Sequence, residues 1–179
     1  LCIKHNGNLW KIESFQHVKP GKGPAFVRTK IRNLNTSRVL ENTFTAGVKI
    51  EIVRIENRAY QFLYQEGNET YHFMNQKNYE QIAIQQNLIN APKYLKEGSI
   101  VDIMFQAENE TPLSCTLPQN VSLKIEFTEP GEKGNTATNA LKPAKTETGA
   151  EVKVPLFINQ GDTVKIDTST GNYIERVKD

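Results

Sequence analysis

The sequence predicts an all-β protein made of small barrels, and three observations carry this prediction. Apolar and polar residues alternate in runs such as residues 121–127 and 164–167, with the period of two that a half-buried strand requires. The strand-like runs are short and are separated by Gly, Asn and Pro residues that favour turns, for example at residues 66–68. Residues 78–84 form the single candidate for a helix, with Asn78 as its expected N-cap.

Ten strand-like segments follow one another along the chain. In order, they cover residues 9–18, 25–32, 48–55, 60–65, 70–74, 100–105, 121–127, 151–158, 164–167 and 173–177. The segments occupy three stretches of about 60 residues each, which fit three small barrels better than one large sandwich. We therefore expect domains at residues 1–55, 56–118 and 119–179.

Two regions are not predicted to be complete strands or helices. Residues 129–149 are rich in Gly, Thr, Lys and Pro and lie between two strong strands, so we expect a long functional loop within the last barrel. The chain begins at Leu1 in strand-like sequence and without a methionine. We therefore expect further residues to precede it.

The composition excludes several classes of protein. The chain has 179 residues, of which 37% are hydrophobic, and is long enough to bury a core. No window approaches 18 consecutive apolar residues and no short apolar stretch follows a basic start, so the sequence predicts neither a transmembrane helix nor a signal peptide. Cys2 and Cys115 lie in no zinc-binding or redox spacing. We expect two reduced thiols in a cytoplasmic protein without a metal or cofactor.

The positive charge of the chain is concentrated in its first 40 residues. Residues 1–40 contain eight Lys and Arg residues and one acid, Glu13, which gives +7. Residues 41–118 contain six basic and ten acidic residues, or −4, and residues 119–179 contain eight and nine, or −1. A basic block beside near-neutral segments predicts that this end binds a polyanion. The alternative, a merely solvated basic face, is disfavoured by the near absence of acids in the block.

The most informative stretch is residues 15–32, where two strand-like runs are joined by a turn. We expect a hairpin whose tip displays one lysine, and the tip has the residues Lys19, Pro20, Gly21, Lys22, Gly23 and Pro24. The two glycines permit backbone angles that are closed to other residues. The two prolines fix their own φ at about −65° and restrict the backbone conformation of the residue before each of them. The tip is therefore expected to be stiff.

The returning strand of this hairpin separates two kinds of side chain. A period of two places one set on the same face: Phe26, Arg28, Lys30 and Arg32. The opposite face is apolar, with Ala25, Val27 and Ile31. A basic ridge of this kind, approached through Lys19, is what a surface that follows phosphates requires.

Three interpretations of the tip can be weighed from the residues alone. A solvated turn, in which Lys22 only adds solubility, is favoured for an isolated Gly-Lys-Gly. A phosphate-binding nucleotide loop is disfavoured because Gly-x-x-x-x-Gly-Lys-Ser/Thr is absent and no helix follows. A Schiff-base lysine needs a desolvated amine, and a projecting tip does not desolvate one. Chemistry by Lys22 alone is therefore not expected.

Three motifs in order resemble the bacterial elongation factor P family, and the resemblance covers the chain nearly end to end. The first is the tip together with the two residues that follow it, residues 19–26. The second runs over residues 142–161 with the pattern K-x-A-x4-G-x2-V-x-V-P-x2-I-x2-G. The third is G-x-Y-x-x-R at residues 171–176. The resemblance changes the interpretation of the tip from a solvated turn to a functional element.

The resemblance implies a fold of three β-barrels, in which an SH3- or KOW-like barrel with the lysine-tipped hairpin precedes two OB-fold barrels. It implies an L-shaped arrangement similar to a tRNA. It also implies a translation elongation factor that is not an enzyme, and that promotes peptide-bond formation at consecutive prolines. Such a factor binds both ribosomal subunits beside the peptidyl-tRNA, and we expect a cytoplasmic monomer that does not bind membranes.

Residue by residue, the resemblance assigns roles to both ends of the chain. Lys22 would reach the 3′ end of the peptidyl-tRNA, while the basic first domain would lie along the acceptor arm. The last domain would approach the small subunit. There the family often has Gly-Asp-Thr near the messenger RNA at the exit site, and this chain has Gly134, Asn135 and Thr136, which lack the charge.

Tyr173 and Arg176 are expected to form a functional pair in the last domain. Residues three apart on a strand point to opposite faces unless the strand is bulged or ends between them.

The tip differs from many members of the family at one position. Pro24 stands where many members have another residue, and in many members an enzyme extends the tip lysine. Members with proline on both sides of Gly-Lys-Gly are thought to work unmodified, and a preorganised tip loses less entropy on docking. Whether Lys22 is modified stays open at this point.

Three alternatives to this assignment remain. The first is the elongation factor P-like paralogue, whose tip usually differs from Lys22. The second is a generic single-strand-binding protein built on OB-folds, which requires aromatic and basic residues interleaved on the later barrels, although those segments are acidic or neutral. The strand aromatics are instead expected in the core: Trp10, Tyr60, Tyr71 and Phe73. A lysine-dependent enzyme is the third, and the exposed tip disfavours it. The scattered histidines are expected to be structural: His5, His17 and His72.

Overall fold

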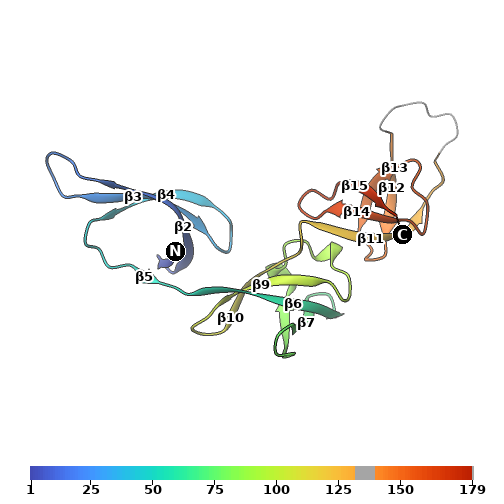
Figure 1. The fold of residues 1–179 in the computed structure, drawn as a ribbon, viewed down its shortest axis with the longest axis horizontal. Coiled ribbons are helices and arrows are strands. Elements are labelled where there is room, and N and C mark those ends of the chain that lie inside the picture. The colour runs from blue at the N-terminus through green and yellow to red at the C-terminus, as the bar shows by residue number, and fades with distance from the viewer. Residues whose placement is uncertain (132–139, 179) are drawn as a thin grey trace. The chain divides into compact units, whose positions relative to one another are not determined.

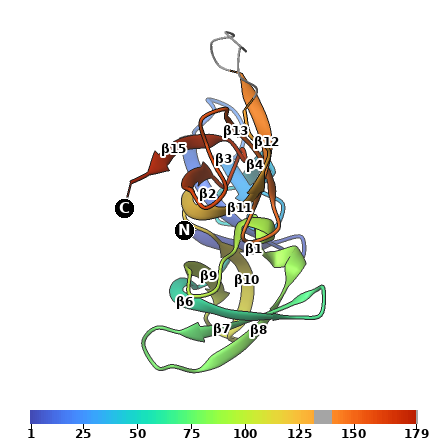
Figure 2. The same ribbon diagram turned by 90° about the vertical axis from the view of Figure 1, so that its right-hand side faces the viewer.

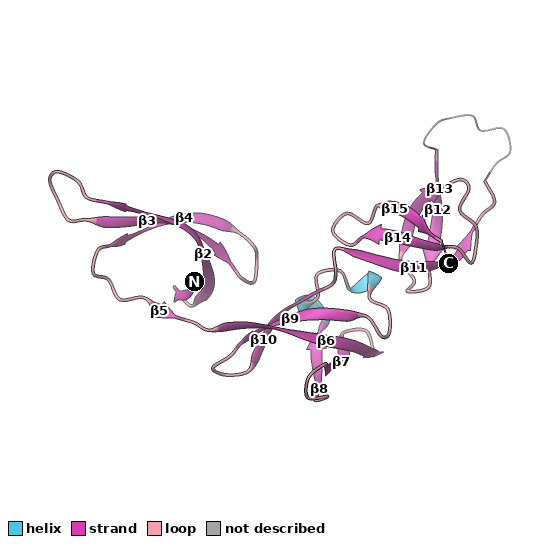
Figure 3. Ribbon diagram, in the orientation of Figure 1, coloured by secondary structure: helices cyan, strands magenta, loops and turns pink. Residues whose placement is uncertain are grey.

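The computed structural model describes residues 1–131 and 140–178 and confirms the all-β fold class. The described residues form fifteen strands and two short 3-10 helices (Figures 1 and 3). The strands assemble into three five-stranded sheets that follow the chain order. By compactness the chain divides into two units, Leu1–Asn57 with Met104–Ser114 and Arg58–Ile103 with Cys115–Asp179. The division into three domains at residues 55 and 118 stays a prediction.

The first sheet has the strand order β4-β3-β2-β1-β5. Its strands are β1 (Cys2–His5), β2 (Asn8–Val18), β3 (Phe26–Asn33), β4 (Val39–Thr45) and β5 (Glu51–Ile52). All four neighbouring pairs are antiparallel. The inner face of this sheet packs Ile3, Trp10 and Ile31 into a small core, with Ile12, Leu40 and Phe44 against it. Because β2 and β3 are longer than this core, their hairpin continues beyond it.

A β-bulge in β2 changes which side chains face inward. Ile12 pairs with Ile31, but the next pair is Ser14 with Lys30, so Glu13 is an extra residue in β2. A strict period of two from Ile12 would point Ser14 inward. The bulge instead places Phe15 on the inner face, opposite the buried Thr29.

The second sheet has the strand order β10-β9-β6-β7-β8. Its strands are β6 (Ile55–Glu66), β7 (Thr70–Asn75), β8 (Gln81–Gln85), β9 (Ile100–Gln106) and β10 (Thr111–Thr116). The two 3-10 helices, η1 (Gln86–Leu88) and η2 (Pro92–Tyr94), lie between β8 and β9. Figure 2 shows β6, β7 and β8 lying side by side. The aromatic residues expected in the cores of the first and second sheets are all buried: Trp10, Tyr60, Tyr71 and Phe73.

The helix expected at residues 78–84 is wrong. Asn78 caps a turn, because its side-chain oxygen accepts a hydrogen bond from the Glu80 amide at 3.1 Å. Tyr79 has a φ of 62°, which an α-helix does not allow. The chain then enters β8, whose Ile84 is buried and pairs with Tyr71. Pairing with β7 therefore overrides the helical preference of Glu80, Gln81 and Ala83.

The third sheet has the strand order β13-β12-β11-β14-β15. Its strands are β11 (Asn120–Thr128), β12 (Leu141–Thr146), β13 (Glu151–Pro155), β14 (Thr163–Asp167) and β15 (Tyr173–Val177). The edge strands β13 and β15 lie near each other, so the sheet curls toward closure. Each sheet contains at least one β-bulge, with further extra residues at Leu63, Glu126 and Ile174. Bulges increase local twist and so help small sheets to curl.

The loop expected at residues 129–149 is wrong for residues 141–146, which form β12. The inward side chains of this strand are Lys142, Ala144 and Thr146, all buried. The Lys142 ammonium donates a hydrogen bond to the Glu129 carbonyl at 2.6 Å. Since none of the three is a large apolar residue, the strand gives no hydrophobic alternation to detect.

Strands β4 and β10 were not expected from the sequence, and the strand expected at residues 48–55 is shorter. Only Glu51 and Ile52 form β5, after which β6 begins at Ile55. Val48 and Ile50 are exposed, with 54% and 37% of their surface accessible. Their alternation therefore does not correspond to burial on this sheet. Among the described residues, no helix is long and apolar enough to cross a membrane.

Candidate nucleic-acid interface

The tip of the β2–β3 hairpin is exposed throughout. The strands end with the pair Val18–Phe26, and all six residues from 19 to 24 are exposed to solvent. The side chain of Lys22 makes no hydrogen bond or ion pair with any residue that the structure describes. The side chains of the tip, at the end of the blue β2–β3 hairpin in Figure 1, are therefore not buried against the described residues.

The two glycines of the tip are not equivalent. Gly23 has a φ of +104°, which residues with a side chain rarely adopt, whereas Gly21 has no positive φ. A Cβ atom at either position would meet no heavy atom within 4 Å. Position 23 therefore requires glycine for its backbone conformation. Position 21 requires glycine neither for its backbone conformation nor for lack of space.

Three cations lie on the outer face of β3, as the period of two predicts. Arg28, Lys30 and Arg32 are exposed, and they alternate with Thr29, Ile31 and Asn33, which are buried. We call these three side chains the basic face. Arg28 and Lys30 make no ion pair or hydrogen bond with the described residues, although Lys30 lies opposite Glu41 in the register.

Arg32 differs from the other two because it is already bound. Its Nε donates a hydrogen bond to the Glu13 carboxylate at 2.6 Å, and an Nη donates to the Ser37 carbonyl at 3.2 Å. Lys11 lies directly opposite Arg32 on β2, and like charges at opposite positions repel. The bulge residue Glu13 places a carboxylate beside this pair and offsets the repulsion. The free positive charge of the basic face is therefore concentrated on Arg28 and Lys30.

Tyr173 and Arg176 stand two rungs apart on β15 because the strand is bulged between them. Tyr173 pairs with Ile166 and Arg176 with Val164, and Ile174 is the extra residue. Ile166 and Val164 are both fully buried, so both partners belong to the inward side of β14. The bulge thus removes the opposite orientation that a regular strand would give them.

Tyr173 and Arg176 have different neighbours. The Arg176 guanidinium lies 5.8 Å from the centre of the Phe157 ring and 3.8 Å from the Asp162 carboxylate. Tyr173 lines an open cavity of about 680 Å³ together with Lys93, Tyr94 and Lys153. The two residues expected to act together thus face separate surroundings. Gly134, Asn135 and Thr136 lie outside the described residues.

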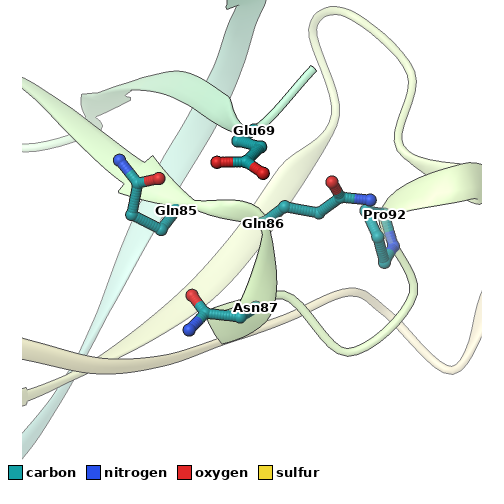
Figure 4. A pocket seen from close by; sticks show the side chains of 5 residues that line it. All are labelled: Glu69, Gln85, Gln86, Asn87 and Pro92. Carbon is teal, nitrogen blue, oxygen red and sulfur yellow. The ribbon is translucent and has the colours of Figure 1, made fainter.

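A second cavity, of about 530 Å³, lies beside the end of β8. It is lined by Glu69, Gln85, Gln86, Asn87 and Pro92, and Figure 4 shows the Gln86 side chain extending toward Pro92. None of the site residues predicted from the sequence lines it. Among the described residues, no group of three or more His, Cys, Asp or Glu side chains could hold a metal ion.

Sequence reasoning missed two residues of the hairpin. Glu13 was counted only as the single acid of a basic block, and its ion pair with Arg32 depends on the bulge. Phe15 is 74% exposed, the most exposed large hydrophobic side chain of the described residues. A hydrophobic residue between Ser14 and Gln16 gives no sign of exposure, so only the strand register reveals it.

Three family models match the chain in succession. They are described as "Elongation factor P (EF-P) KOW-like domain" for residues 1–50, "Elongation factor P (EF-P) OB domain" for residues 55–115, and "Elongation factor P, C-terminal" for residues 121–176.

Curated relatives named "Elongation factor P" match the whole length. Those of Flavobacterium johnsoniae and Christiangramia forsetii are each 55% identical over 100% of this chain and 95% of the relative. "Elongation factor P 1" of Porphyromonas gingivalis is 52% identical over the same shares. A solved structure of eukaryotic translation initiation factor 5A from Methanococcus jannaschii matches with a TM-score of 0.48 and 20% identity, over 64% of this chain and 86% of that chain.

Proposed function

The chain belongs to the elongation factor P family, and from this membership we propose that it binds the ribosome beside the peptidyl-tRNA and promotes peptide-bond formation at consecutive prolines. The partners in this proposal are both ribosomal subunits and the peptidyl-tRNA. The observation that carries it is the exposed Lys22, without a partner among the described residues, at the end of a basic hairpin. An ammonium held in that way is available to a phosphate or carbonyl oxygen of the RNA.

The basic face would bind the RNA backbone. Arg28 and Lys30 are exposed and free of ion pairs within the described residues, so their charges are available to phosphates. Lys19 stands at the base of the tip and would add a further contact. These contacts would fix the position of the hairpin, and the position of the hairpin would fix that of Lys22.

The chemical contribution of the factor would be positioning. Proline is a constrained nucleophile, and a peptidyl-tRNA end that moves freely spends little time in a reactive pose. Binding that end in one orientation lowers the activation barrier without any proton transfer by the factor. The prolines Pro20 and Pro24 support this role, because a preorganised tip loses less conformational entropy on docking.

The third sheet would approach the small subunit. Arg176 offers an exposed guanidinium for RNA or protein contacts, and Tyr173 lines an open cavity beside two lysines, Lys93 and Lys153. Residues 134–136 would lie near the messenger RNA at the exit site, with Asn135 as an uncharged contact.

The test measures binding and peptide synthesis in parallel. With Lys22→Ala, we expect nearly unchanged affinity for ribosomes stalled at a proline run, because only one of several cations is lost. We expect loss of the stimulation of proline-run synthesis, and no change on a proline-free template. Lys22→Arg should give partial stimulation, because a planar guanidinium replaces a compact ammonium. Lys77→Ala is the matched control, because it removes one exposed lysine outside the hairpin, and it should retain stimulation.

Two results would contradict the proposal. Full stimulation by Lys22→Ala would exclude the role of the tip lysine. Failure of the parent protein to bind ribosomes would exclude the function as a whole.

A further inference from the structure

The β2–β3 hairpin has a second exposed face beyond the core, opposite the basic face. Phe15 stands on it opposite Thr29, and His17 stands one rung nearer the tip, opposite Val27. Both side chains are exposed, and 74% of the Phe15 surface is accessible. We call Phe15 and His17 the aromatic face.

The strand register separates the aromatic face from the basic face. Because Glu13 is an extra residue in β2, the inward positions change from Trp10 and Ile12 to Phe15 and His17. Arg28 and Lys30 project on the other side, opposite Gln16 and Ser14. One hairpin therefore presents cations on one side and rings on the other.

The surroundings of Phe15 favour a flat partner over an apolar groove. Across the sheet, Phe15 pairs with Thr29 of β3, which in turn pairs with Asn42 of β4. The Thr29 hydroxyl donates a hydrogen bond to the Asn42 carbonyl at 2.8 Å. A protein groove that buried Phe15 would need further exposed apolar side chains beside it, whereas the next rung toward the tip has the exposed His17 with Val27 and Phe44, which are both partly buried. An exposed aromatic ring whose partners across the sheet are polar matches the stacking platforms that bind unpaired bases.

Charge indicates the same class of partner. No acidic side chain stands on the two inner rungs of β2, β3 and β4 that contain Phe15 and His17. The other side of the same hairpin carries Arg28 and Lys30, and its tip carries Lys22. RNA supplies both the phosphates that the cations bind and the bases that the rings stack upon.

We propose that Phe15, with His17 beside it, is a stacking platform for an unpaired nucleobase of the RNA that the basic hairpin enters. The proposal rests on the ribosome binding proposed above and adds a residue to it. The base belongs either to ribosomal RNA or to the bound tRNA, and the chemistry is the same for both.

The experiment measures binding of the full chain to 70S ribosomes, with and without peptidyl-tRNA in the P site, over a series of salt concentrations. Phe15→Ala should weaken binding by about 5- to 150-fold, the range for loss of one aromatic–base stack. The dependence of log affinity on log salt should keep its slope, because no phosphate contact is removed. Phe15→Trp should restore the affinity, and Phe15→Leu, which is apolar but cannot stack, should not.

Tyr79→Ala is the matched control, because Tyr79 is 70% exposed and lies in a segment without a basic face. It should bind like the parent. The thermal midpoint of each variant reports folding, and an exposed ring should leave it unchanged. An effect of Phe15→Ala with empty ribosomes assigns the base to ribosomal RNA, and an effect only with tRNA assigns it to the tRNA.

Three outcomes would overturn the proposal. Parent-like binding by Phe15→Ala excludes any contact, and full binding by Phe15→Leu identifies an apolar protein contact instead. A reduced salt slope in Phe15→Ala would mean that the variant had disturbed the basic face. Each of these differs from a failure of the proposed function, in which the parent protein itself does not bind ribosomes.

Discussion

Lys96 and Glu147 join two sheets within the second compact unit. The Lys96 ammonium, in the segment before β9, lies 3.0 Å from the Glu147 carboxylate, in the turn between β12 and β13. The same carboxylate accepts a hydrogen bond from the Lys124 amide of β11 at 2.9 Å. Next to it, the Thr148 hydroxyl donates to the Lys93 carbonyl at 2.7 Å. Glu147 is therefore the charged member of a small junction between the sheets.

Stability is expected to depend on pH through Glu147. Burial raises the pKa of this carboxyl, but hydrogen bonds from Lys124 and Lys96 and the charges of both lysines outweigh it, so the pKa lies below 4.5. A lowered folded-state pKa contributes stability that is complete above about pH 4.5 and is lost as pH falls through the folded value. Glu147→Gln should cost about 0.2–1 kcal/mol at pH 7.

Denaturant titrations at pH 7 and pH 3 measure this effect. The difference between the parent and Glu147→Gln should be smaller at pH 3 than at pH 7, because protonation of Glu147 removes the charge that distinguishes the two side chains. Glu151→Gln is the control, because its exposed carboxylate makes no ion pair with the described residues. An equal or larger difference at the lower pH would contradict the assignment.

Gly21→Ala and Gly23→Ala should have different effects on activity. Alanine fits the backbone at Gly21, whereas at Gly23 it would occupy a φ of +104°, at a cost of about 1–3 kcal/mol. Because the tip contacts nothing within 4 Å of either position, we expect the backbone to rearrange instead of the fold being lost. Gly23→Ala should keep its thermal midpoint and lose stimulation at proline runs. Equal activity of the two variants would show that the conformation of Gly23 is not required.

Ribosome affinity should depend on Arg28 and Lys30 more than on Arg32. Neutralising Arg28 and Lys30 together should reduce the slope of log affinity against log salt by about 1.5–2, one phosphate contact for each. Arg32→Ala should change it less, because Glu13 already binds that guanidinium at 2.6 Å. Glu13→Gln should steepen the slope by releasing Arg32. A larger effect from Arg32→Ala than from the double variant would exclude this assignment.

Arg176→Ala should reduce activity while leaving the fold stable. The side chain is 44% exposed and its contact with Asp162 is long, at 3.8 Å, so its loss should cost less than about 0.5 kcal/mol. Glu175→Ala on the same strand is the control, since it also removes one surface ion pair, with Lys165 at 3.1 Å. Peptide synthesis and thermal unfolding of both variants measure the difference. A large loss of stability in Arg176→Ala alone would indicate a structural role.

The strands that were predicted well are those with large apolar residues on one face. The segments expected at residues 70–74, 100–105 and 164–167 differ from β7, β9 and β14 by one residue at one end, and residues 173–177 form β15 although Arg176 is one of its inward positions. The helix expected at residues 78–84 failed because the pairing of Ile84 with Tyr71, which places residues 81–85 in β8, is a contact between residues that lie apart in the sequence. β12 was not predicted, because its inward positions carry Lys142, Ala144 and Thr146 and so show no hydrophobic alternation. The Lys142 ammonium can be buried because it donates a hydrogen bond to one backbone carbonyl.

The candidate site was predictable where it depended on local sequence. Turn residues and a period of two were enough to expect an exposed tip and a row of cations on β3. The bulges were not predictable, because an extra residue is defined only by the partner strand. For this reason Glu13, Phe15 and Ile174 acquired their positions only from the register of the pairs.

The isolation of the tip from the rest of the molecule has an evolutionary consequence. Residues 19–24 make no side-chain hydrogen bond or ion pair within the described residues, and both glycines face open space. Substitutions there are therefore nearly invisible to selection for folding. Almost every member of a library with a randomised tip should therefore fold. Differences in proline-run synthesis among its members would then report the effect of the tip sequence on activity, and not a loss of the fold.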